Sequence, residues 1–478
     1  MPKIHPISSL SFACAGLLLS TCDMREASAQ AVPAATGAKP VHAIPWLNDY
    51  SDLADPARRS GAAAERWHYI PLGEDPAHYL SLGGEIRYYY NDYDHSYIGV
   101  RANDANAMLQ QRFRAYADWH AGPDFRLFVE LGDNREFFED RPTPPNNNRL
   151  ELQQAFFDVS FDLGQGNRLT VRPGRFLMPL GDGNLAAVRD GVNTRYQYDG
   201  IRAMFSTAGG RKLDLFATHP TAIKDGSSFD DAGNRAVDFS GVYFSTPLPR
   251  VPGHNLDVFF YSHGRDVARY QAISADERRY SFGMRGWRKR LPWDYDAEFV
   301  YQFGDFGSGG SIDAWGLLFN LGYTLSEVRF APRLGVRLNA FSGDDHPGDG
   351  HIGTFAPMFP RLPMYSDASW FTMMNLVDLY PSVTFAFSRS LNLMVGVDAM
   401  WRQSTRDAIY DGPSSAPLAI ASTRDRHVGT NFNLQSDWQV NRFLNFHLYY
   451  THLWAGDALQ AAGGGDADYY GVWGQLRF

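Results

Sequence analysis

Residues 109–132 read LQQRFRAYADWHAGPDFRLFVELG, and this stretch decides between the fold classes open to the chain. Apolar and polar side chains alternate through residues 109–119, which is the period of a β-strand with one apolar and one polar face. Residues 121–124 (AGPD) then form a tight turn, and residues 125–132 repeat the alternation. The stretch therefore predicts two long antiparallel strands joined by a short turn.

The same alternation recurs almost to the last residue. Residues 80–90 form a first such strand, and fifteen more are expected around Phe157, Val171, Ala203, Leu215, Phe239, Val258, Phe282, Phe299, Leu317, Val336, Phe385, Val397, Phe432, Leu448 and Val472. Tight connections at 164–167, 208–211, 388–390 and 440–442 contrast with long ones at 179–197, 342–372 and 403–425. About eighteen strands with alternating short and long connections predict an all-β transmembrane antiparallel β-barrel.

Composition supports a barrel over a helical membrane protein. The chain is 14% aromatic, its mean hydropathy is −0.34, and no apolar run approaches the roughly twenty residues of a spanning helix. Alternating strands average to such a composition. Residues 469–478 alternate up to Phe478, as the closing strand of an outer-membrane protein does. A large soluble β-protein is the alternative fold.

The first residues read as an export signal, and the chain divides into three parts. Residues 1–29 are the predicted cleavable signal peptide, ending at Ala27-Ser28-Ala29, and residues 30–78 are a proline-rich periplasmic lead-in. Residues 79–478 form the barrel in the bacterial outer membrane, with short turns in the periplasm and long loops outside. Lipidation at Cys22 is the alternative reading of the leader. Both cysteines, Cys14 and Cys22, precede the predicted cleavage site.

Charge and motifs exclude several classes of function. The net charge of −9 argues against nucleic acid as a partner. The chain lacks convincing nucleophile-elbow, zinc-protease and nucleotide-binding motifs, so we expect no enzyme and no cofactor. A lipid hydrolase built from a serine and His219, His263, His427 or His447 stays open as a lesser alternative. Residues 343–351 (GDDHPGDGH) are interpreted as a solvated loop rather than a divalent-cation site, and no metal is expected.

Several motifs together resemble the alginate export family of outer-membrane porins. They are WHYIPL at 67–72, YLSLGGEIR at 79–87, QRFR at 111–114, VRPGRF at 171–176, RDGVNTR at 189–195, YDGIR at 198–202, FSGDD at 341–345 and DLYP at 378–381. The resemblance covers residues 66–478 and implies a monomeric eighteen-stranded barrel with a cationic constriction for a polyuronate. The tight connection near Asn441 departs from the known alginate exporter, which leaves alginate itself open as the substrate.

Ten arginines share the polar face of the predicted strands and are the candidate substrate pathway, together with two glutamates. They are Arg87, Arg112, Arg114, Arg126, Arg172, Arg202, Arg285, Arg333, Arg337, Arg402, Glu85 and Glu130. A guanidinium binds a carboxylate through two hydrogen bonds and repels cations. Motif positions favour Arg87, Arg112, Arg114, Arg172 and Arg202, while a bulge at 173–174 leaves the face of Arg175 open. The structural alternative is that the arginines only pair with carboxylates across the lumen; the expected partners are Glu85, Asp118, Glu130, Asp158, Asp214, Asp257, Asp296, Glu298 and Asp398.

The sequence thus predicts an outer-membrane channel for secretion or diffusion of an anionic, alginate-like polysaccharide. The alternative is a general uptake porin for aromatic acids or oligosaccharides. Expected partners are an anionic polysaccharide or oligosaccharide, outer-membrane lipid and a periplasmic secretion scaffold. Eight inward-facing aromatic residues are interpreted either as a sugar-stacking track or as packing residues, namely Tyr89, Tyr116, Phe128, Phe259, Tyr261, Tyr449, Tyr469 and Trp473.

Overall fold

The computed structural model describes residues 41–101, 104–139, 145–271, 273–420 and 423–478. The predicted signal peptide, including Cys14 and Cys22, lies outside these ranges. In the described part of the chain, no helix is long and apolar enough to cross a membrane.

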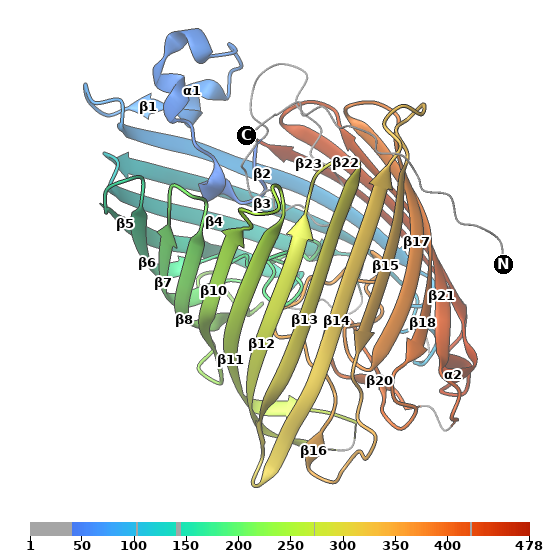
Figure 1. Ribbon diagram of the computed structural model, residues 1–478. Helices are drawn as coiled ribbons and strands as arrows, with labels where there is room; N and C mark the ends of the chain where they lie inside the picture. The colour runs from blue at the N-terminus through green and yellow to red at the C-terminus, as the bar shows by residue number, and fades with distance from the viewer. Residues whose placement is uncertain (1–40, 102–103, 140–144, 272, 421–422) are drawn as a thin grey trace, which may run out of the picture.

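Eighteen antiparallel strands form one closed barrel (Figure 1). They are β2 (His78–Tyr93), β3 (Asn106–Ala121), β4 (Phe125–Phe137), β5 (Asn148–Asp162), β6 (Arg168–Phe176), β7 (Tyr198–Ser206), β8 (Lys212–Ala222), β10 (Val237–Pro247), β11 (Asn255–Arg269), β12 (Ser274–Arg288), β13 (Trp293–Phe306), β14 (Gly310–Thr324), β15 (Arg333–Phe341), β17 (Leu376–Ala386), β18 (Leu391–Arg402), β21 (His427–Gln439), β22 (Leu444–Ala455) and β23 (Ala467–Arg477). Each strand centre predicted from alternation lies within one of them, so the strand prediction is confirmed.

The barrel closes where its first and last strands meet. β2 pairs with β3 on one side and with β23 on the other, with Glu85 opposite Arg477. Short strands add to the sheet at its margins: β1 (Ile70–Pro71), β9 (Ala232–Gly233) and β16 (His351–Ile352). β19 (Ile409–Tyr410) and β20 (Pro417–Ala419) pair only with each other.

The two faces of the wall differ as the alternation predicts. Phe113, Leu215 and Phe299 are exposed on the outer surface, whereas Arg112 and Arg114 beside Phe113 are buried. Because successive side chains of a strand point to opposite faces, the apolar set faces outward and the polar set inward. An apolar outer band is what a lipid environment requires.

The two ends of the barrel carry different connections. Short turns lie at one end, for example residues 207–211, 289–292, 387–390 and 440–443. Long loops lie at the other, including residues 177–197, 342–375 and 403–426. The predicted contrast between tight and long connections is confirmed, and their periplasmic and extracellular sides remain predictions. We refer below to the short-turn end and the long-loop end.

The described N-terminal segment lies at the short-turn end (Figure 1). It forms short helices: η1 (Pro45–Leu47), η2 (Ser51–Ala54), η3 (Pro56–Arg58) and α1 (Glu65–His68). Its prolines prevent a longer element. Arg442, in the turn between β21 and β22, binds Glu65 at 3.0 Å, and the hydroxyl of Ser81 donates to the carbonyl of His68 at 2.5 Å. The remaining helix, α2 (Asp457–Gln460), lies at the long-loop end.

Candidate transport pathway

A cavity of about 2780 Å³ occupies the barrel interior toward the short-turn end. Its lining includes backbone turns at that end, such as residues 388–390 and 439–443. Parts of the loops 177–197 and 342–375 form its inner boundary, at residues 179–184 and 363–367. The cavity is therefore a vestibule that faces the short turns.

The two loops that bound the vestibule fold into the barrel and pack against each other. The amide of Ala187 donates to the carbonyl of Phe359 at 2.8 Å, and the amide of Phe359 donates to Leu185 at 3.0 Å. The Phe359 ring lies 5.2 Å from Tyr198 and 5.0 Å from Phe239 of the wall. Both loops contribute side chains to one apolar cluster that fills this level of the lumen.

Three of the arginines favoured by the motif positions bind the loop 177–197 instead of lining the vestibule. Arg87 donates to the carbonyl of Asp190 at 2.6 Å, Arg112 binds the Asp190 carboxylate at 2.8 Å, and Arg114 lies 3.5 Å from the carbonyl of Asn193. Strand periodicity cannot foresee this, because the loop that covers these side chains is aperiodic. Their role in a substrate pathway stays untested.

Glu85 and Arg195 complete the charged group that binds the loop 177–197. Glu85 accepts from Arg112 at 2.5 Å and lies 3.5 Å from Arg195, which binds Asp190 at 2.7 Å. All these side chains are largely buried, so each charge depends on the others for compensation. Glu130, on the neighbouring strand β4, lies 3.6 Å from Arg114.

Six of the ten arginines line the vestibule, and each is paired with a carboxylate. The pairs are Arg126 with Asp118, Arg172 with Asp158, Arg202 with Asp214, Arg285 with Asp257 and Asp296, Arg333 with Asp294, and Arg337 with Asp378 and Asp398. Sequence reasoning had named most of these partners but missed Asp294 and Asp378. Glu298 accepts a hydrogen bond from Asn184 at 2.9 Å.

Arg402 and Arg175 lie elsewhere. Arg402 donates to the carbonyls of Thr405, Thr423 and Asp425, so it organises the loop 403–426. Arg175 binds Asp199 at 2.7 Å and does not line the vestibule. Residues 157 and 158 have no partner in the pairing of β5 with β6, but the register is the same on both sides of this gap and is continuous between β6 and β7. The bulge expected at 173–174 is therefore not observed, and Arg175 lies on the opposite face of β6 from Arg172.

The N-terminal segment reaches into the vestibule, which the sequence analysis did not foresee. The Trp46 ring lies 4.2 Å and the Phe156 ring 3.8 Å from the guanidinium of Arg172, and the two rings are nearly perpendicular to each other. Both contacts are cation–π interactions, which stabilise the charge of Arg172. The available signal was the apolar run AIPWL at residues 43–47 within the proline-rich lead-in.

Of the eight inward aromatic residues, Tyr449 and Trp473 line the vestibule. The other six pack in the wall, as the stack of Tyr116, Phe128 and Phe156 illustrates, with ring centroids 5.6 and 5.2 Å apart. Of the eight, Tyr449 and Trp473 therefore stay candidates for a sugar track. The positions of the other six are explained by packing.

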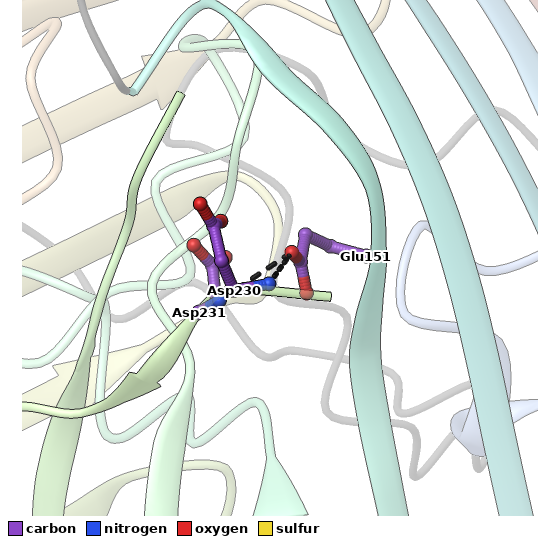
Figure 2. A group of neighbouring side chains, drawn as sticks. All are labelled: Glu151, Asp230 and Asp231. Carbon is purple, nitrogen blue, oxygen red and sulfur yellow. Dashed lines mark hydrogen bonds between the residues drawn. The ribbon is translucent and has the colours of Figure 1, made fainter. Parts of the chain in front are cut away.

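Among the described residues, one group of carboxylates lies close enough together to hold a metal ion: Glu151, Asp230 and Asp231. Figure 2 shows the Glu151 carboxylate meeting the backbone amides of the other two residues. Asn148 donates to Asp231 at 2.7 Å. These bonds attach the loop 223–236 to β5, and this attachment explains why the three carboxylates lie close together.

Three comparisons with known proteins show what this chain is similar to. A family model described as alginate export matches residues 78–473. A search of curated protein sequences found no match. Among solved structures, similarity is found with Acinetobacter baumannii OccAB3, at 11% identity and a TM-score of 0.57, covering 84% of this chain and 99% of that one.

Two Pseudomonas aeruginosa structures are similar to the same extent. The outer membrane protein opdK has 12% identity and a TM-score of 0.56, with 84% of this chain and 98% of that chain covered. OccD3 (OpdP) has 13% identity and a TM-score of 0.54, with 90% and 97% covered. At these identities the likeness concerns the barrel fold.

Proposed function

The chain belongs to the alginate export family, and on that premise we propose that it is an outer-membrane channel for an anionic carbohydrate. The substrate class we favour is a uronic-acid polymer or its oligomers. The observation that carries the proposal is the vestibule, where six arginines and several aromatic rings surround a cavity of about 2780 Å³. Short turns then face the periplasm and long loops the exterior.

The paired arginines retain hydrogen-bonding capacity toward a passing sugar acid. Nη1 of Arg172 and Nη1 of Arg202 are buried and have no hydrogen-bond partner among the described residues. Both residues line the vestibule, so a side-chain movement that exposes these nitrogens would let them donate to a sugar acid. A guanidinium keeps its charge and offers five donors, of which one carboxylate uses two. Binding through the remaining donors is weak enough for release, which transport requires.

Planar-bilayer recording with added oligouronates tests the proposal. We expect an anion-selective pore in which oligouronate produces transient blocks. Removing two complete ion pairs, by Arg172→Gln with Asp158→Asn and Arg202→Gln with Asp214→Asn, should shorten the blocks about tenfold, since about 1.4 kcal/mol is lost. Complete pairs are removed so that no carboxylate is left buried without its partner.

The matched control removes the Arg175 and Asp199 pair, which lies outside the vestibule. Arg175→Gln with Asp199→Asn should leave the block duration unchanged. A cation-selective pore, or one indifferent to oligouronate, would overturn the substrate class. Block by aromatic acids in place of oligouronate would favour an uptake porin.

A further inference from the structure

Exposed cationic side chains that form no ion pair lie at the mouth of the vestibule, where it opens at the short-turn end. Lys212, Arg290 and Arg389 are exposed, and all three line the cavity. No carboxylate of the described residues forms an ion pair with any of them. By contrast, the six strand arginines of the vestibule described above are each paired with an aspartate. We call Lys212, Arg290 and Arg389 the mouth cluster.

The mouth cluster spans alternate short turns, so its charges are spread along the rim. Lys212 follows the turn between β7 and β8, Arg290 lies between β12 and β13, and Arg389 lies between β17 and β18. Two further rim cations are already occupied, because Lys289 lies 3.4 Å from Asp182 and Arg442 binds Glu65. Arg288, at the end of β12, also lines the cavity without an ion pair but is only partly exposed, so the exposed unpaired charge at the rim belongs to these three side chains.

The two ends of the barrel differ in the sign of their charge. The short turns carry Arg211, Arg250, Lys289, Arg290, Arg329, Arg389 and Arg442, against Asp124 and Glu327. In the long loop 342–375, the part that does not line the vestibule carries Asp344, Asp345 and Asp349 and no lysine or arginine. A polyanion approaching the short-turn end is attracted, and one approaching the long-loop end is repelled.

We propose that the mouth cluster captures a polyanion whose carboxylates recur along an extended chain and feeds it into the vestibule from the short-turn end. This deepens the proposed function and rests on it, because it adds a direction and a capture step to the same channel. Rim charges govern the rate of association more than the lifetime of a complex, whereas desolvated pairs govern the lifetime. The mouth cluster should thus set how often a polymer enters, and Arg172 and Arg202 how long it stays.

A lipid headgroup is the competing source of negative charge at this end. Arg211, Arg250 and Arg329 are exposed at the same end and do not line the vestibule. The mouth cluster carries the same number of exposed charges as these three residues but faces the cavity, which favours a ligand inside the lumen. This contrast also supplies a control with the same change in net charge.

The test is single-channel recording in bilayers of zwitterionic phosphatidylcholine at low salt, with an oligouronate added to one chamber at a time. The orientation of each channel is read from the chamber in which an impermeant thiol reagent modifies a Gly209→Cys background. We compare the parent with the mouth variant Lys212→Ser, Arg290→Ser, Arg389→Ser and the control Arg211→Ser, Arg250→Ser, Arg329→Ser. Block from the short-turn side should be more frequent than from the long-loop side in the parent.

In the mouth variant we expect the frequency of block from the short-turn side to fall at least about tenfold, with block duration unchanged. The control should keep both values. Equal frequencies in the mouth variant and the parent would overturn the capture step and leave the channel proposal intact. An equal fall in the control would assign the effect to the general surface potential and overturn the mouth cluster. The recording is repeated in bilayers that contain phosphatidylglycerol. A difference between the mouth variant and the parent that is seen only there would assign these residues to lipid instead, and the absence of block in every protein would overturn the substrate class itself.

Discussion

Arg112 shows how strongly a single lumen residue depends on its surroundings. Its guanidinium binds Glu85, the Asp190 carboxylate and the carbonyls of Asp190 and Val192. Arg112→Met would leave two buried carboxylates without this partner, and we expect a loss of about 3–5 kcal/mol of stability. Urea unfolding in detergent, followed by tryptophan fluorescence, measures it. Arg278→Met breaks an exposed ion pair with Asp238 and should cost at most about 1 kcal/mol, so equal losses would contradict this account.

Glu65 gives the N-terminal segment a defined dependence on pH. Burial alone would raise the pKa of Glu65, but hydrogen bonds from Ser60 and the ion pair with Arg442 lower it from 4.5 to about 2. Because the folded-state value is depressed, the contribution is complete above about pH 4.5 and is lost as the pH falls toward 2. The Gly61 amide donates to the Glu65 carboxylate at 3.0 Å, so hydrogen exchange at this amide, corrected for intrinsic rates, should show the release. Glu65→Gln should abolish the dependence, and Glu74→Gln, at an exposed site, should preserve it.

At the scale of elements, Asn193 holds the inward loop 177–197 in place. Its amide group donates to the carbonyls of Gln111, Arg135 and Asn146, at 2.8 to 3.0 Å. Asn193→Leu keeps the volume and loses these bonds, at a cost of about 3 kcal/mol, so the released loop becomes roughly a hundredfold more populated. Single-channel recording should show added current noise and higher mean conductance. Gly191→Ala, where a Cβ meets nothing within 4 Å, should record as the parent does.

The strands and the inward loops differ in how far sequence could predict them. Alternation follows from the covalent geometry of an extended chain, so the inward face of residues such as Arg126 and Arg172 was predictable without contacts. Which arginines meet open space depends on the loop 177–197, whose carbonyls cover Arg87 and Arg112. That loop has no period, and its partners are distant in sequence. The intrusion of Trp46 was hidden for the same reason.

For the whole molecule, the apolar outer band should decide insertion. Val242 lies in the middle of β10, and Val251 lies in the turn that follows it; both are exposed, by 38% and 47%. Val242→Arg places a charge against hydrocarbon and should cost about 2–4 kcal/mol of folding free energy into a bilayer. Val251→Arg should cost little, because a turn residue remains among headgroups or water. Folding into vesicles, followed by heat-modified mobility, compares the two, and equal yields would contradict a lipid-facing band at Val242.

The seam between β2 and β23 also sets the order of events during assembly. It is joined between residues 392 positions apart, as the contact of Arg477 with Glu85 shows. β2 is synthesised early, yet its second neighbour is the last strand of the barrel, so one of its edges waits for nearly the whole chain. An unpaired strand edge recruits other strands, and contacts so distant in sequence form slowly. The protein is therefore most prone to wrong strand pairing between the synthesis of β2 and its pairing with β23. A chaperone or insertase has its greatest effect if it covers the free edge of β2 during this period.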